Sequence, residues 1–115
     1  MANVLDKLFT PVQLANAAGT PQYTSPITPP TRTKLTKITV CNTTGGAVTV
    51  TAEIIIYGGA AATKYKVYDA YSIAANSQEE LFLLAGHVLQ PGDFLDIFAS
   101  AATSISCSGA GLKMT

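Results

Sequence analysis

Charged side chains are scarce in this chain. Lys, Arg, Asp and Glu together make up 12% of the 115 residues, whereas about 25% is usual for soluble domains. Seven basic and seven acidic residues give a formal net charge of zero, so the basic excess typical of nucleic-acid-binding proteins is missing. The deficit has two interpretations, a neutral surface rich in Thr and Ser or a surface covered by partner proteins. We favour the second, because a free domain usually keeps itself soluble with charge.

Side chains for catalysis or metal binding are equally few. His87 is the single histidine, whereas metal sites of the cupin type need several histidines, so we expect no metal. A Ser or Cys nucleophile would have this one histidine as its base. Asp93 and Asp96 flank a turn and are expected to face outward, and the adjacent Glu79 and Glu80 of a strand point to opposite faces. We thus expect solvated carboxylates at both pairs. We therefore predict no enzymatic activity and no cofactor.

Long apolar runs are absent as well. The most apolar stretch, residues 54–57, is far shorter than the roughly 20 residues of a membrane span. Asp6 and Lys7 interrupt the apolar start, so we expect no signal peptide. Cys41 and Cys107 fall inside predicted strands, where we expect buried thiols, and a disulfide would require those two strands to be neighbours.

What the chain does have is alternation of apolar and polar residues with a period of two. From residue 33 onward, short runs of this kind are separated by Gly, Pro, Asn and Asp, and the clearest spans 47–57. Pro91, Gly92 and Asp93 predict a turn, and Gly109 and Gly111 suggest a bulge or a close approach of another backbone. The pattern predicts an all-β domain over 33–115, an antiparallel β-sandwich or jelly roll of seven or eight strands.

The first 32 residues differ from the rest, because they hold five of the six prolines. Proline imposes extended geometry on its neighbourhood, so we predict an extended N-terminal arm over 1–32, with disorder as the alternative. A short helix over 3–10, capped by Asn3 and ended by Pro11, is expected within it. Residues 12–14 could add a short edge strand. We expect the arm to contact a partner through its apolar side chains: Val4, Leu5, Leu8, Phe9, Val12, Leu14, Tyr23 and Ile27.

A second contact surface is expected on the sandwich. Ile55 and Tyr57 interrupt the polar face of their strand, and Tyr68 points away from Tyr65 and Tyr71 in a regular strand. Core packing is the default for such residues, and use at an interface is the alternative. We predict Ile55, Tyr57 and Tyr68 as interface residues, and exposed tyrosines also leave open a carbohydrate-binding module.

Two segments, TKITVCNTTGGAVTVTAEI and YSIAANSQEELFLLAGHVLQPGDFLDIFASAATSISCSGAGLKMT, resemble small virion proteins of tailed bacteriophages. The resemblance covers about residues 33–115 and leaves the arm unexplained. Its signatures are an Ile-x-Val-x-Asn strand end, a Val-Thr-Val-Thr strand, an Ala-Ala-Asn turn and a Gly-x-x-Leu-x-Pro-Gly-Asp turn. They lie at Ile38, Val40, Asn42, 48–51, 73–76, Gly86 and 89–93.

The resemblance implies a structural, non-enzymatic role at many copies per particle. Together with the low charge, the arm and the lack of a catalytic site, it leads us to expect a capsid decoration (cement) protein. Such a protein would be made in the host cytoplasm and bind the outer face of the capsid. It would staple neighbouring copies of the major capsid protein through residues 1–32, stabilise the DNA-filled head, and self-associate as a dimer or trimer. A head–tail joining or tail component is the first alternative. No nucleic-acid or membrane partner is expected.

Overall fold

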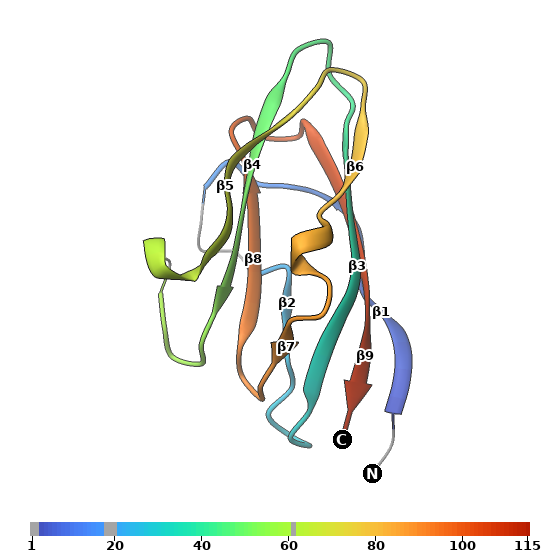
Figure 1. Ribbon diagram of the computed structural model, residues 1–115, viewed down its shortest axis with the longest axis vertical. Coiled ribbons are helices and arrows are strands. Elements are labelled where there is room, and N and C mark those ends of the chain that lie inside the picture. Colours follow the sequence, from blue (N-terminus) through green and yellow to red (C-terminus); the bar gives the residue numbers. More distant parts are fainter. Residues whose placement is uncertain (1–2, 18–20, 61) are drawn as a thin grey trace.

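The computed structural model describes residues 3–17, 21–60 and 62–115, which form two antiparallel β-sheets packed face to face. Figure 1 shows the sandwich from its side, with one sheet on each side of the view. The prediction of an all-β sandwich is confirmed. Sheet A has the strand order β1 (Asn3–Gln13), β9 (Ile105–Met114), β3 (Arg32–Asn42) and β6 (Gln78–Glu80), and β7 (Val88–Leu89) also pairs with β3. Sheet B has the order β2 (Tyr23–Thr24), β8 (Phe94–Ala99), β4 (Val48–Ile55) and β5 (Lys66–Ile73).

The hydrophobic core lies between the two sheets. On β3, Thr33 and Leu35 are buried and alternate with exposed neighbours, as a half-buried strand requires. A register shift between Leu35 and Lys37 moves the alternation by one residue, so that Ile38 and Val40 continue the buried face. The inward residues of β4 and β8 meet this face from sheet B: Val48, Val50, Ala52, Leu95, Ile97 and Ala99.

The helix expected over residues 3–10 is wrong, because these residues belong to the edge strand β1, which pairs with β9. A helix of eight residues is marginal in water, whereas β9 offers backbone hydrogen-bond partners to an extended strand. A register shift between Lys7 and Phe9 lets two consecutive apolar side chains, Leu8 and Phe9, turn toward the core. Of the predicted short strand at 12–14, residues 12 and 13 are the last part of β1, which ends at Gln13.

Two glycines of β9 make the docking of β1 possible. A Cβ atom on Gly109 would lie 2.8 Å from Cε1 of Phe9, and one on Gly111 would lie 2.9 Å from Cδ1 of Leu8. The same atom on Gly111 would also lie 2.7 Å from the carbonyl oxygen of Lys34. The close approach predicted at these two glycines is therefore present, with β1 on one side and β3 on the other.

Strand β5 is less regular than its sequence suggests. It begins at Lys66, after the short 3-10 helix η1 (Thr63–Tyr65), and Ala70 has a φ of 51°. The register against β4 shifts on both sides of Ala52, so Tyr68 and Ile73, five residues apart, are both buried in the core. Strict alternation would have placed these two side chains on opposite faces.

The segment after β6 closes the side of the sandwich that faces the viewer in Figure 1. Here the short strand β6 is followed by the 3-10 helix η2 (Phe82–Leu84). The backbone of this segment bonds to β3, since Leu81 N–H donates to the Ile38 carbonyl and Leu35 N–H donates to the His87 carbonyl. Leu84 is fully buried and fills the space between the two sheets.

Candidate interaction surfaces

On the outward face of sheet A, basic side chains of β1 and β3 flank the small side chains of β9. Lys7 and Lys37 lie on either side of Ala110 in the register of β1, β9 and β3. Together with Pro11 and Ser108 they surround a shallow hollow of about 220 Å³. The hollow exists because β9 presents small outward residues between two strands with larger ones.

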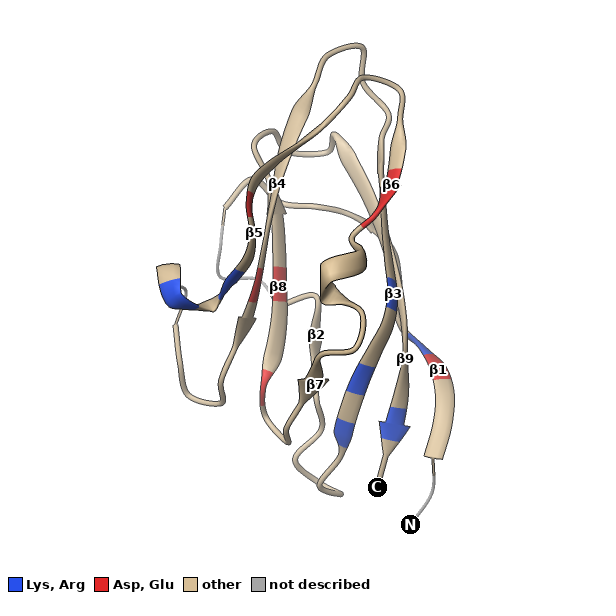
Figure 2. Cartoon of the chain, in the orientation of Figure 1, with Lys and Arg blue, Asp and Glu red and all other residues tan. Residues whose placement is uncertain are grey.

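Basic residues are the main charged groups in the half of this face where β3 begins (Figure 2). Arg32 and Lys34 are exposed on β3 and alternate with buried residues, so they point outward with Lys37. Glu80 lies 3.9 Å from Lys37 and supplies the one acidic group that we place on this face. Figure 2 shows the basic residues concentrated on the strands of sheet A and the acidic residues spread over both sheets. The face would suit an acidic partner.

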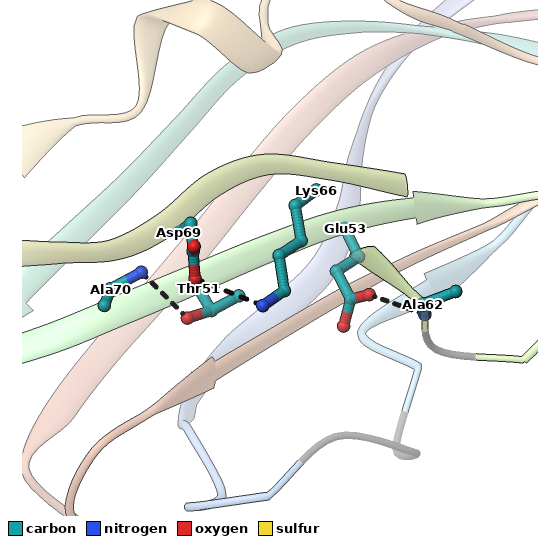
Figure 3. Close-up of polar contacts among 6 residues, drawn as sticks. All are labelled: Thr51, Glu53, Ala62, Lys66, Asp69 and Ala70. Atoms are coloured by element: carbon teal, nitrogen blue, oxygen red, sulfur yellow. Dashed lines mark hydrogen bonds and ion pairs between the residues drawn. The ribbon is translucent and has the colours of Figure 1, made fainter. Parts of the chain in front are cut away.

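The outward face of sheet B holds carboxylates that are used inside the molecule. Glu53 of β4 pairs in register with Asp96 of β8, and both side chains are buried. Glu53 Oε2 accepts a hydrogen bond of 3.2 Å from Ala62 N–H, which ties the backbone at Ala62 to β4 (Figure 3). The expectation that Asp96 is solvated is wrong, because this side chain is 1% exposed.

Two further contacts in Figure 3 hold the irregular edge strand β5. Thr51 Oγ1 accepts a hydrogen bond of 3.1 Å from Ala70 N–H, at the residue with positive φ. Lys66 Nζ lies 3.1 Å from Asp69 Oδ1. Polar side chains on the outer surface of sheet B thus stabilise the sheet itself and leave few charges for a partner.

The side chains predicted to form the contact surface of the arm divide into two groups. Leu8, Leu14 and Tyr23 are buried in the core of the same chain, and Phe9 packs against that core. The other four stay exposed: Val4, Leu5, Val12 and Ile27. Leu5 is the most exposed, at 74%. The exposed group is therefore the part of the prediction that a partner could still cover.

The predicted sandwich interface is divided in the same way. Tyr57 is exposed, and its ring lies on Gly92 in the predicted turn, whose φ is +90°. Asp93 fixes this arrangement by accepting a 3.0 Å hydrogen bond from Tyr57 N–H. Ile55 and Tyr68 are buried, and the hydroxyl of Tyr68 accepts a 3.1 Å hydrogen bond from Leu83 N–H.

Several exposed apolar residues are not among the predicted contacts. They are Ile56, Tyr71, Phe82, Leu83 and Val88. Phe82 and Leu83 belong to η2. In the sequence this apolar segment resembles a strand, in which two adjacent side chains would point to opposite faces, so nothing predicts that both face solvent. The hydroxyl of Tyr71 donates a 2.9 Å hydrogen bond to Glu79 Oε1 and so links β5 to β6 across the same side of the sandwich.

A larger hollow of about 630 Å³ lies at the end of the sandwich where β3 begins and β9 ends. Arg32 supplies its basic group and Val88 its most exposed apolar side chain. The other lining residues are Pro30, Gln90, Pro91, Met114 and Thr115.

The two cysteines lie on neighbouring strands, yet both are free thiols. Cys107 pairs in register with Val40, and Cys41 pairs with Ser106. Cys107 faces the core, where burial raises the pKa of its thiol to about 12. Cys41 is partly exposed and faces outward beside Thr39 and Ser108 in a second, smaller hollow of sheet A.

No group of three or more His, Cys, Asp and Glu side chains suited to a metal ion occurs within residues 3–17, 21–60 and 62–115. His87 is an exposed loop residue whose carbonyl accepts a hydrogen bond from Leu35 N–H. In the part of the chain that the structure describes, no helix is long and apolar enough to cross a membrane.

Comparisons with known proteins give fold relatives and no family. No family model and no curated protein matches the chain. A subunit from the structure of Bacillus endospore appendages, described as disulfide-linked pili, superposes with a TM-score of 0.55 at 19% identity, over 98% of this chain and 88% of that one. A chain from the structure of infectious bursal disease virus, Gx strain, superposes with a TM-score of 0.52 at 13% identity, over 99% of this chain. The match spans 33% of the viral chain. At these identities the likeness shows a shared fold.

Proposed function

We propose that this chain is a structural subunit that works in many copies, and specifically a capsid decoration (cement) protein of a tailed bacteriophage. The observation that carries the proposal is the number of large apolar side chains left exposed on a sandwich with little charge. Grouped exposed apolar side chains mark interaction sites on soluble proteins more than scattered ones do, and six of the exposed side chains here are neighbours in pairs: Val4 and Leu5, Ile56 and Tyr57, Phe82 and Leu83. The exposed large apolar side chains are Val4, Leu5, Val12, Ile27, Ile56, Tyr57, Tyr71, Phe82, Leu83 and Val88.

In this proposal the domain binds the outer face of the capsid and connects neighbouring copies of the major capsid protein. Contacts come from the exposed apolar residues of β1 and of η2, on two different parts of the sandwich. Self-association as a dimer or trimer would multiply weak contacts, because each subunit raises the effective concentration of the next. The pilus and virus proteins that share the fold make a structural, non-enzymatic role the natural expectation.

A head–tail joining or tail component is the second candidate, since it would use the same kind of surface at a lower copy number. A carbohydrate-binding module is less favoured. Tyr68 is buried and Tyr71 is hydrogen-bonded to Glu79, so the tyrosines do not form one exposed platform for sugar stacking.

The test is binding to intact particles. Particles are purified from cells that produce the full-length chain, and immunogold labelling locates it. The proposal predicts regular labelling over the head and protection of the particles against heat-induced DNA release. Labelling confined to the neck or tail would favour the second candidate, and absence from particles would refute both.

Two variants identify the surface responsible. Leu5→Asp and Phe82→Asp change side chains that are 74% and 64% exposed, so the fold should persist. Each should weaken particle binding by about tenfold or more if the residue lies at the centre of a contact. Ala101→Asp, in an exposed loop, is the matched control and should bind as the unchanged chain does. Equal binding of all three variants would exclude both surfaces.

A further inference from the structure

Strand β1 is fastened to the sandwich along one edge. It stands at the end of the strand order of sheet A and pairs with β9. A side-chain ion pair, Lys113 Nζ to Asp6 Oδ2 at 3.3 Å, adds to the backbone ladder, and exposed pairs of this kind contribute little to stability. The strand is held by its ladder and by two apolar side chains.

Leu8 and Phe9 pack into space that two glycines of β9 leave open. Gly109 and Gly111 leave the space that the ring of Phe9 and the methyl groups of Leu8 occupy. Filling this space removes apolar surface from water and so stabilises the fold. An identical strand from another copy would fill the same space equally well.

The pairing of β1 with β9 is irregular in its second half, just before the buried residue Leu14. The register shifts between Lys7 and Phe9 and again between Phe9 and Val12, and Pro11 within the second shift has no N–H to donate. Immediately beyond β1, Leu14 is 1% exposed and its N–H donates a 2.9 Å hydrogen bond to the Ile105 carbonyl. Residues 3–13 could therefore leave while residue 14 stays in place, and an extended segment of that length spans about 36 Å.

We propose that β1 is exchanged between copies: residues 3–13 of one copy pair with β9 of a second copy and place Leu8 and Phe9 against its Gly109 and Gly111. The inference rests on the proposed function in many copies. Exchange preserves every contact of β1, so its cost is the entropy of association and not the loss of packing. Reciprocal exchange gives a dimer, and exchange around a ring gives a trimer.

A cysteine pair distinguishes exchange from docking within one chain. Leu5 and Leu112 are in register on β1 and β9, at the Cα separation of cross-strand neighbours, which a disulfide can span. The full-length chain carries Leu5→Cys and Leu112→Cys together with Cys41→Ser, which removes the partly exposed thiol. The thiol of Cys107 is buried and remains unreactive. The protein is oxidised by air with copper phenanthroline at the concentration where light scattering detects oligomers.

Exchange predicts covalent dimers or trimers on a non-reducing denaturing gel, in the same proportion as the oligomers seen by light scattering. The control is Lys37→Cys with Ala110→Cys in the same background. This in-register pair joins β3 to β9, two strands of the body of the sandwich, and should close within the monomer. A 1:1 mixture of tagged Leu5→Cys and untagged Leu112→Cys single variants should give the mixed disulfide.

A Leu5/Leu112 disulfide found entirely within the monomer, or no disulfide at all, overturns exchange. If light scattering then still shows oligomers, the proposed function in many copies survives. If the unchanged chain is monomeric at every concentration and the disulfide is intrachain, self-association fails with it.

Discussion

The two sheets bury similar aliphatic side chains between them and use their outward faces differently. On sheet A, Lys7, Arg32 and Lys34 are exposed and available to a partner. On sheet B, Glu53 and Asp96 are buried, and Glu53 accepts a hydrogen bond from Ala62 N–H of the same chain. The surface is thus even poorer in accessible charge than the composition suggests, and what charge it offers is mainly basic and on one sheet.

The contact between the sheets should be the most sensitive to substitution. Leu84→Ala removes a fully buried side chain of η2 and should destabilise the fold by about 2–5 kcal/mol, because the cavity cannot collapse completely. Chemical denaturation measures the loss. Leu83→Ala, next to it and 52% exposed, is the control, and an equal loss from both would show that η2 does not pack as described.

The second-largest loss of stability is expected on sheet A, when a side chain is added at a glycine that a neighbouring strand approaches closely. Gly111→Ala places a Cβ 2.7 Å from the carbonyl oxygen of Lys34, and overpacking of this kind costs about 1–3 kcal/mol. Thermal unfolding measures the effect. Gly46→Ala, where a Cβ would meet no atom within 4 Å, should leave the midpoint nearly unchanged.

Sheet B should respond more locally. Glu53→Ala removes the acceptor of the Ala62 N–H bond, and loss of one such bond costs about 1 kcal/mol. Hydrogen exchange of the Ala62 amide should accelerate, while amides of sheet A keep their rates. Glu80→Ala, whose partner is 3.9 Å away on the surface, serves as the comparison. Acceleration throughout both sheets would mean that the loop and the sandwich unfold as one unit.

The smallest effect on stability is expected at the exposed hydrogen bond between Tyr71 of β5 and Glu79 of β6, which joins the two sheets. The hydrogen bond to Glu79, reinforced by the charge of that carboxylate, raises the pKa of Tyr71 above its usual 10.0. A folded-state pKa above the unfolded value means that the stabilisation is fully present below pH 10 and is lost as the pH rises through the folded pKa. The stability difference between the unchanged chain and Tyr71→Phe should therefore shrink above pH 10.

Absorbance of tyrosinate gives a direct check on that link. Tyr71 should ionise at a higher pH in the unchanged chain than in Glu79→Gln. The absorbance change at that higher pH should be missing from Tyr71→Phe. Identical titration curves for the three proteins would show that the pair between β5 and β6 does not persist in solution.

The alternation of apolar and polar residues was enough to predict the sandwich, because strands such as β4 follow it along most of their length. It was not enough at β1, where Val4, Leu5, Leu8 and Phe9 fit a helical face as well as a bulged strand. The choice between the two depends on Gly109 and Gly111, about a hundred residues away in the sequence, and local pattern carries no information about such pairing.

The irregular segments explain the remaining errors. A shift of one residue within β5 reverses the face of every later side chain, so Tyr68 was assigned to an interface and lies in the core. Asp96 is buried beside Glu53 of the neighbouring strand β4, and alternation within β8 does not reveal which residue of another strand lies next to it. The exposed residues of η2 were missed because a continuous apolar run reads as strand.

The pairing of Asn3 with Met114 brings the start of β1 and the end of β9 together at one end of the molecule (Figure 1). A short turn could join these ends, with new termini opened in the exposed loop at 101–103 or 43–47. In such a circular permutant β1 would follow β9 directly as a hairpin. The permutant would keep the fold, but its β1 could pair only with β9 of the same copy. Comparing it with the unchanged chain would separate the properties of the monomer from those that require strand exchange.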